Sequence, residues 1–152
     1  MYALTIWQPW ADAITRGTKR AENRPWPAPR WVIGETIAIH AGRHYDRYAL
    51  PPPGMSWPLP RIPPGALPLG AVVATALVTS CHHSRQANGN PRCQCSPWAA
   101  PGQYHWQLGA VRALPEPIPA RGYQRLWRLP AAVLAELSGQ APAEPVERGR
   151  AA

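Results

Sequence analysis

The sequence lacks phenylalanine, contains a single lysine and has only three cysteines. An odd and small number of cysteines argues against a disulfide framework. The longest apolar run, residues 70–78, has the length of a strand, whereas a membrane helix needs about 20 residues. The N-terminus has no charged stretch followed by an apolar stretch and a cleavage site. These absences predict a soluble, cytoplasmic protein.

Basic residues outnumber acidic ones, and nearly all of them are arginine. The chain has 16 Lys and Arg against 8 Asp and Glu, giving a net charge of +8 and a pI of about 10.3. A folded domain with this charge favours a polyanionic partner, either nucleic acid or an anionic membrane surface. A generally basic proteome would produce the same excess, so charge alone leaves the partner open.

The one lysine, Lys19, lies in the most densely charged segment, residues 17–24. Arginine is a planar fork that stays charged, whereas lysine is a compact point charge that can also act as a base or nucleophile. A lysine in a chain that otherwise uses arginine therefore indicates a local need for the ammonium group. The alternative is drift on a GC-rich genome that left one lysine by chance.

Hydrophobic periodicity and turn residues predict one mainly β domain of the α+β class. Alternating apolar residues predict strands, and Pro9, Gly17 and Pro130 mark the ends of two short helices. The predicted architecture is a small β-barrel with helices that plug or flank it. The strands are expected at residues 2–6, 36–40, 70–79, 104–108 and 125–129, and the helices at 9–17 and 130–137.

Two irregular insertions interrupt the predicted domain, which spans residues 1–137. Residues 50–68 contain eight prolines, a density that excludes regular structure. Residues 81–102 form a second predicted loop, rich in Cys, His, Asn, Gly and Pro. Residues 138–152 are expected to be a disordered tail.

The second loop contains potential metal ligands. Cys81, His83, Cys93 and Cys95 are four donors of the kinds that bind zinc, and a zinc ion would fix an otherwise irregular loop. The Cys-x-Cys spacing is tighter than the usual Cys-x₂-Cys. The alternative is a set of free cytosolic thiols.

Aromatic and charged residues around Lys19 suggest a binding site. Glu22 lies three residues after Lys19 and Arg24 two further on, a spacing that can turn the lysine and the carboxylate toward one pocket. The alternative is a surface ion pair worth roughly 0–1 kcal/mol. Trp10 and Trp26 flank this segment. A stacked base on such a ring contributes about 1–3 kcal/mol, although packing in the core is the favoured role for Trp10.

Five ordered pieces of the sequence resemble the ASCH family, which is related to the PUA fold. They include the signature Gly17-x-Lys19-x-x-Glu22-x-Arg24; the others are residues 4–11, 33–41, 70–74 and 121–128. The resemblance implies a five- to six-stranded β-barrel with flanking short helices. It also implies a cleft beside the first helix that binds nucleic acid or a modified nucleotide and is lined by the signature lysine and its neighbours.

One branch of the ASCH family removes the acetyl group from N4-acetylcytidine with a Lys, a Thr three residues later and a distant Glu. Lys19 matches the first position, but Glu22 stands at the second, and the only candidate for the third, Glu116, lies among prolines. An amidohydrolase that uses Lys19 and Glu22 is therefore the alternative function. Ribonuclease activity has also been suggested in the family, and His40 is one candidate for an acid–base pair.

The sequence thus predicts a nucleic-acid-binding domain, for RNA or single strands rather than duplex DNA, that requires no cofactor. A protein-interaction module that uses the prolines is a third interpretation. The predicted ligand-binding residues are Gln8, Trp10, Lys19, Glu22, Arg24, Trp26, His40, Trp127 and Arg128.

Overall fold

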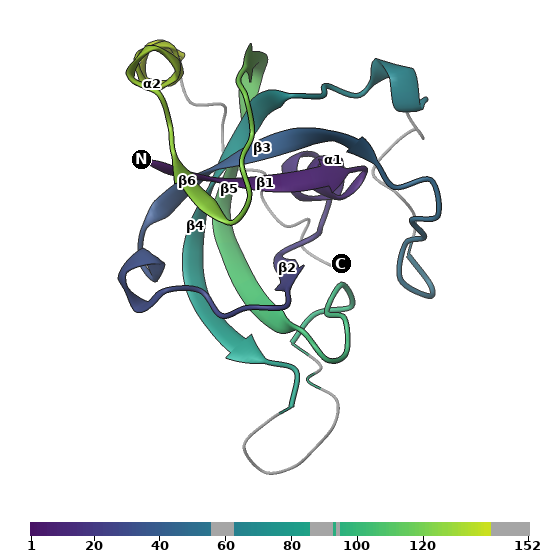
Figure 1. Cartoon of the computed structure of the whole chain (residues 1–152). Helices are drawn as coiled ribbons and strands as arrows, with labels where there is room; N and C mark the ends of the chain where they lie inside the picture. The colour runs from purple at the N-terminus through teal and green to yellow at the C-terminus, as the bar shows by residue number, and fades with distance from the viewer. Residues whose placement is uncertain (56–62, 86–92, 94, 141–152) are drawn as a thin grey trace, which may run out of the picture.

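A computed structural model describes residues 1–55, 63–85, 93 and 95–140, which form a six-stranded sheet and two α-helices (Figure 1). The strands are β1 (Tyr2–Gln8), β2 (Ala21–Arg24), β3 (Thr36–Tyr45), β4 (Ala71–His83), β5 (Tyr104–Pro119) and β6 (Leu126–Arg128). The helices are α1 (Trp10–Thr15) and α2 (Ala131–Gly139). Two 3₁₀ turns, Arg30–Val32 and Pro64–Ala66, lie in connecting segments.

The strands confirm the predicted α+β class but form an open sheet. The order is β2-β5-β4-β3-β1-β6; β1 and β3 are parallel and all other neighbours antiparallel. No pairing joins β2 to β6 among the described residues, so the predicted barrel is not closed. The edge strands are only four and three residues long, and α1 packs inside the curve of the sheet against β1, β3, β4 and β5.

The two longest strands extend beyond their predicted limits. Strand β5 continues to Pro119 because its pairing with β4 steps from Ala113 to Ile118, which leaves residues 114–117 outside the register. Prolines are tolerated in a strand at such unpaired positions. Strand β4 continues to His83, so the prediction that the irregular loop begins at Cys81 is wrong for its first three residues.

Some boundaries stay predictions. Residues 56–62 of the proline-rich insertion, 86–92 and 94 of the Cys/His loop, and 141–152 of the tail lie outside the described residues. Helix α2 ends at Gly139, two residues beyond its predicted end, so the chain is still helical where the disordered tail was expected to begin.

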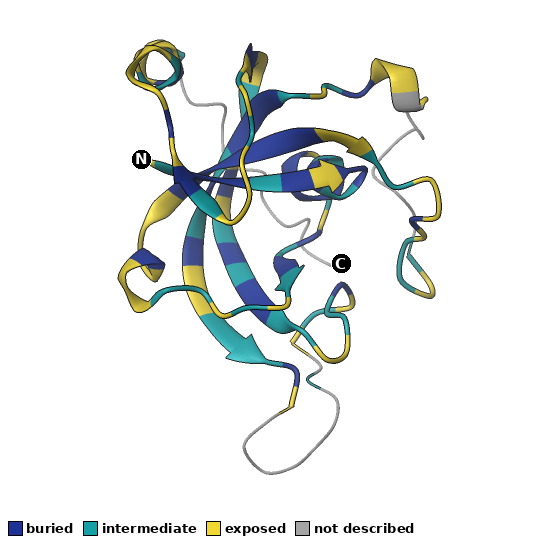
Figure 2. Ribbon diagram, in the orientation of Figure 1, coloured by how far each residue is buried: buried dark blue, intermediate teal, exposed yellow. Residues whose placement is uncertain are grey.

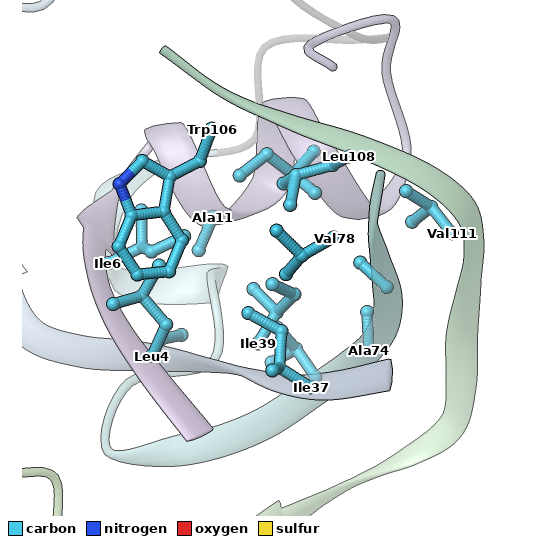
Figure 3. Close-up of a cluster of buried hydrophobic side chains, with 14 of the residues drawn as sticks. Leu4, Ile6, Ala11, Ile37, Ile39, Ala74, Val78, Trp106, Leu108 and Val111 are labelled. Carbon is cyan, nitrogen blue, oxygen red and sulfur yellow. The ribbon is translucent and has the colours of Figure 1, made fainter. Parts of the chain in front are cut away.

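Apolar side chains cover both faces of the sheet. On the face that holds α1, the indole of Trp106 lies among aliphatic side chains from β1, β3, β4 and α1 (Figure 3). On the other face, a smaller cluster packs Trp127 and Leu129 against Leu137 of α2. The middle of the sheet is therefore buried from both sides (Figure 2). The large internal cluster fixes the inner faces of β2 and β5, which carry the candidate site.

Candidate functional site

The turn after α1 points Lys19 toward the protein interior. The backbone N–H of Lys19 donates to the carbonyl of Ala13 (3.1 Å), which folds the chain back directly after the helix. The guanidinium of Arg20 donates to the carbonyls of Ile14, Gly17 and Lys19 at 2.9–3.1 Å and stabilises this turn. Lys19 is only 2% exposed, so the single lysine of the chain is a buried residue.

Lys19, Glu22 and Arg24 form a continuous chain of charges. The ammonium of Lys19 lies 3.0 Å from Glu22 Oε2 and also donates to the carbonyl of Ala21. Arg24 Nε lies 3.1 Å from Glu22 Oε1, a charge contact without a directed hydrogen bond. Arg24 Nη2 donates to the carbonyl of Thr5 (2.6 Å) on β1. One carboxylate thus lies between two cations, and the predicted spacing does bring these three side chains together.

Burial sets the energetic importance of this network. Glu22 is 6% exposed, and its strand position is directly opposite Trp106, at the edge of the main core. Coulomb attraction is much stronger there than at a surface, and a charge left unpaired would be costly. The alternative of a weak surface ion pair is therefore excluded by the burial of both partners.

Thr5 connects the charge chain to a pocket of about 770 Å³. Its carbonyl accepts the bond from Arg24, and its hydroxyl accepts one from Trp127 Nε1 (3.0 Å). The pocket opens beside β1 and β3 and is closed by the segment before β6. It is lined by Thr5, His40, Gly42, Arg43, Arg121, Gly122, Tyr123 and Gln124. Exposed arginine side chains therefore line the pocket from two separate segments of the chain.

His40 forms a rigid part of the pocket wall. It is 1% exposed, its Nε2 lies 3.0 Å from the carbonyl of Ala120, and its ring meets Trp127 edge-to-face at 5.4 Å. Because Nε2 faces a carbonyl it carries the proton, which leaves Nδ1 as a buried acceptor without a hydrogen-bond partner. Burial lowers the pKa of His40 despite the bond to Ala120. The ring is therefore neutral at pH 7.

Gly122 permits the close approach of the loop to His40. A Cβ atom at this position would lie 2.4 Å from His40 Cε1 and 2.9 Å from Thr5 Oγ1. Any larger residue would have to displace both pocket residues.

The predicted tryptophans differ in how they are held. Trp26 packs edge-to-face on Trp106 (4.8 Å), and the guanidinium of Arg125 lies 5.8 Å from its ring centroid. Trp10 donates from Nε1 to Asp46 (3.3 Å) and packs against the main core, as its favoured role required. Both indoles pack against the main core, and that of Trp26 also lies next to the guanidinium of Arg125.

Two other predicted residues have contacts away from the charge chain. The Gln8 side chain accepts from the N–H of Asp12 and donates to the carbonyl of Pro68, both at 3.0 Å, so it holds the start of α1. Arg128 Nε donates to the hydroxyl of Tyr2 (3.1 Å) across β6 and β1. Their assignment to a binding surface stays a prediction.

A separate cluster of histidines and cysteines lies at the far end of β4 and β5. One ligand atom each from His82, Cys93, Cys95 and His105 falls within 4.8 Å of the others, so the cluster can hold a metal ion. All three cysteines are free. The predicted ligands Cys93 and Cys95 are members, but Cys81 and His83 are not.

Strand alternation explains this correction. Side chains of successive strand residues point to opposite faces of a sheet. His82 is paired with His105, whereas Cys81 packs against the main core and its thiol accepts from the N–H of Ala28 (3.3 Å). His83 contacts Tyr104 instead. A prediction that treated these residues as a loop could not distinguish the two faces.

Of the residues that line the pocket, the sequence predicted His40 but not the others. Arg43, Arg121 and Tyr123 come from two segments 78 positions apart in the sequence, and only their strand context brings them together. The signal available was the glycine in Arg121-Gly122-Tyr123, because glycine often marks a close approach of the backbone to another group.

Fold and site together define a small α+β domain in which a buried Lys–Glu–Arg chain is connected through Thr5 to an arginine-lined pocket. The family model of the ASCH domain matches residues 4–118, and the chain belongs to this family. The matched residues fall within the predicted domain 1–137, whose boundaries stay a prediction.

Solved structures of ASCH from Zymomonas mobilis have the same fold. The unmodified protein aligns with a TM-score of 0.55 and 15% identity over 92% of this chain and 95% of that one. A serine-to-alanine mutant aligns with a TM-score of 0.54 and 16% identity over 92% and 96% of the two chains. A tyrosine-to-phenylalanine mutant gives 0.55 and 16% over 92% and 98%. No curated protein sequence matches the chain significantly.

Within the described part of the chain, no helix has the length and apolar character required to cross a membrane.

Proposed function

We propose that this ASCH domain binds nucleic acid, RNA or another single strand or a modified nucleotide, on the basic surface around the Lys19–Glu22–Arg24 chain and the pocket that adjoins Thr5. Arg43 and Arg121 supply phosphate contacts at the pocket, and Tyr123 offers a ring for stacking. The binding needs no cofactor. The free cysteines favour the cytoplasm as its location.

The pocket is the observation that carries this proposal. Two exposed arginines and a tyrosine gather around a cavity large enough for a nucleotide, and Arg121 lies 5.5 Å from the ring centroid of Tyr123. Arginine suits phosphate because its fork donates two parallel hydrogen bonds. An aromatic ring beside such a cation accepts any base, since every base has a π-face. Preference for single strands follows because stacking on a ring requires unstacked bases.

The buried ion pairs support a positioning role for Lys19. An ammonium that lies against a carboxylate and donates to a carbonyl holds the turn before β2 and the guanidinium of Arg24 in place. It thereby fixes the β1 carbonyl at Thr5, next to the pocket. In this function Lys19 anchors the site and is not consumed or deprotonated.

A salt titration of binding to a single-stranded RNA oligonucleotide tests the proposal. We expect binding at about 50 mM salt and a linear fall of log affinity with log salt. Arg121→Ala should reduce the slope by about 1, because one phosphate contact is lost. Arg30→Ala, an exposed arginine in the 3₁₀ turn, is the matched control and should leave the slope unchanged. Absence of RNA binding at low salt would refute the function, and weaker binding to the equivalent DNA supports RNA as the ligand.

The 3.0 Å contact between Lys19 and Glu22 favours a second candidate, hydrolysis of N4-acylated cytidine. Water would add to the amide carbonyl with Glu22 as base, and breaking the C–N bond would release acetate and cytidine. Cytidine release from N4-acetylcytidine, lost in Lys19→Arg, would establish the enzyme. RNA binding by the unaltered chain that weakens in Lys19→Arg, together with no turnover of N4-acetylcytidine, would establish the binding domain.

A further inference from the structure

Four electron-pair donors converge on the outer face of β4 and β5. His82 and His105 occupy directly opposed positions on the two strands, and their rings lie 5.4 Å apart in an edge-to-face arrangement. Cys93 and Cys95, from the segment that follows β4, complete the group: His82 Nε2 lies 2.9 Å from Cys93 Sγ, and His105 Nδ1 lies 3.4 Å from Cys95 Sγ. Each histidine therefore presents one ring nitrogen to one thiol.

Surrounding groups orient the donors as they do in a metal site. His105 Nε2 lies 2.7 Å from the carbonyl of Ala100, so this nitrogen carries the proton and Nδ1 keeps its lone pair toward the cysteines. Gln107 Nε2 donates to Cys95 Sγ (3.3 Å), and the backbone N–H of Cys95 donates to Cys93 Sγ (3.4 Å). Such donors stabilise thiolates, the form that binds metal.

The dimensions fit a tetrahedral ion with two nitrogen and two sulfur ligands. Zinc bonds of about 2.0–2.3 Å place neighbouring ligand atoms roughly 3.3–3.8 Å apart at the corners of a tetrahedron. The four atoms here lie within 4.8 Å of one another, so closure requires shifts of about 1 Å or less in the cysteine segment. Soft thiolate and imidazole ligands in this geometry select zinc among the common divalent ions.

We propose that His82, Cys93, Cys95 and His105 hold one structural Zn²⁺. Binding displaces a proton from each of the two thiols and leaves two zinc–thiolate and two zinc–imidazole bonds, with no position open for water or substrate. The ion carries out no chemistry. Its role is to hold Cys93 and Cys95 against the histidines of β4 and β5.

A bound ion would change how the two cysteines are held, because a coordinated thiol loses its proton outright. Among the described residues, the two thiols contact the two histidines, an amide side chain, a backbone N–H group and each other. These groups leave both sulfur atoms close enough to share one cation.

The segment that zinc would secure also holds the strand that carries Glu22. Asn23 Nδ2 donates to the carbonyl of Trp98, and Asn23 Oδ1 accepts from the N–H of Ala100, both at 2.9 Å. Trp98 Nε1 donates to Thr18 (3.3 Å), the residue before Lys19. The metal-bound segment thus covers the outer face of β2, whereas Glu22 and Arg24 extend from its inner face. The ion supports the candidate site without contacting it.

Cobalt titration of the reduced, metal-free full chain tests the site. We expect uptake of about one equivalent of Co²⁺ with the absorption of a tetrahedral ion bound by thiolates, and displacement by one equivalent of Zn²⁺. Protein isolated from zinc-supplemented cells should contain the same amount. A metal-free chain that takes up less than about a tenth of an equivalent of either ion would overturn the proposal, as would a Cys93–Cys95 disulfide that persists under reducing conditions.

Matched variants distinguish this ligand set from the neighbouring cysteine and histidine. Cys95→Ser and His105→Asn should lose the thiolate-to-cobalt absorption or the tetrahedral spectrum, whereas Cys81→Ser and His83→Asn should keep both. Circular dichroism of each variant shows whether the fold is retained. Loss of cobalt binding in His83→Asn, with binding retained in His105→Asn, would overturn the assigned ligands. Because the cobalt spectrum is measured on the unaltered chain first, the test holds even if one variant fails to fold.

Discussion

Two polar clusters lie on opposite faces of the sheet where β2, β5 and β4 are neighbours, and their charges are balanced in different ways. On the inner face, Lys19, Glu22 and Arg24 neutralise one another and are tied to backbone carbonyls. On the outer face, His82, Cys93, Cys95 and His105 bring four metal-ligating atoms within 4.8 Å of one another. The more deeply buried inner cluster balances its charges with side chains of the chain itself, whereas the less buried outer cluster gathers ligands that, in our proposal, an ion completes.

This difference indicates what each cluster does. A buried ion pair is weak evidence for stability, but it fixes the geometry of its partners, because removing one partner leaves a charge without compensation. Converging neutral donors give little stabilisation until a metal arrives. We therefore infer that the inner cluster positions the binding site and that the outer cluster makes the position of β2 depend on zinc.

The largest expected effect tests whether the charges of the inner cluster compensate one another. Glu22→Gln leaves Lys19 and Arg24 buried without a counter-charge and should lower the free energy of unfolding by about 3–5 kcal/mol. Urea denaturation measures it. The control is Asp12→Asn, which breaks the more exposed Asp12–Arg16 pair in α1 and should cost roughly 0–1 kcal/mol. Equal losses in the two variants would show that the inner cluster is effectively hydrated.

The next effect tests whether the outer cluster controls the inner one. Removing zinc with a chelator should loosen the contacts of Trp98 and Asn23 on β2. Lys19 should then be methylated reductively about tenfold faster, because the free energy of local opening falls by about 1.4 kcal/mol. Mass spectrometry measures the methylation rate of Lys19 without interference, because Lys19 is the only lysine in the sequence. The exposed N-terminal amine serves as an internal reference.

The metal-free Cys95→Ser variant is the control for that measurement. Its Lys19 should react at the fast rate with or without chelator. If chelation of zinc from the unaltered protein leaves the methylation rate of Lys19 unchanged, the two clusters are not coupled and zinc acts only on the residues around it.

The sequence predicted most of the elements that have strong local patterns. Residues 36–40 and 70–79 alternate or are continuously apolar, so the central strands β3 and β4 were expected close to where they lie. The Gly-x-Lys-x-x-Glu-x-Arg spacing brought together the three residues of the charge chain. These side chains do converge as expected. They are also buried, which a segment of charged residues did not indicate.

What the sequence could not predict depends on pairing between distant segments. Strand β2 is four residues of mixed polarity, and it is a strand only because β5 offers it a partner. The metal ligands depend on register: the pairing of His82 with His105 selects one histidine of the His82-His83 pair over the other. The open arrangement of the sheet likewise depends on which distant strands pair, which no local pattern encodes.

A smaller effect tests how closely the pocket wall is fitted. Gly122→Ala places a methyl group 2.4 Å from His40 Cε1 and should cost about 1–3 kcal/mol, because the ring and its bond to Ala120 must shift. The expected RNA affinity is also lower. Gly139→Ala, with open space around the added atom, is the control and should change stability by at most about 1 kcal/mol. A Gly122→Ala protein as stable as the control would mean that the loop moves freely away from His40.

The smallest expected effect is the change in stability with pH that results from protonation of His40 in the pocket wall. Burial lowers the pKa of His40 in the folded protein below the ordinary value of 6.5, although the bond to the carbonyl of Ala120 acts in the opposite direction. Between the two pKa values the unfolded chain binds a proton that the folded chain does not. Stability therefore rises with pH across this window, and is lost as the pH falls below about 6.5.

We expect the free energy of unfolding of the unaltered protein to fall more steeply between about pH 7 and pH 5 than that of His40→Gln, which cannot take up this proton. Taking the difference between the two proteins removes the contribution of the other titrating groups. His44→Gln is the matched control, because His44 is exposed and packs against Trp7 outside the residues that line the pocket, and the pH profile of this variant should follow that of the unaltered protein. Parallel profiles for the unaltered protein and His40→Gln would show that His40 is as free to take up a proton as it is in the unfolded chain. The pocket wall would then be open to water, and its rigid role would have to pass to Trp127 and Thr5 alone.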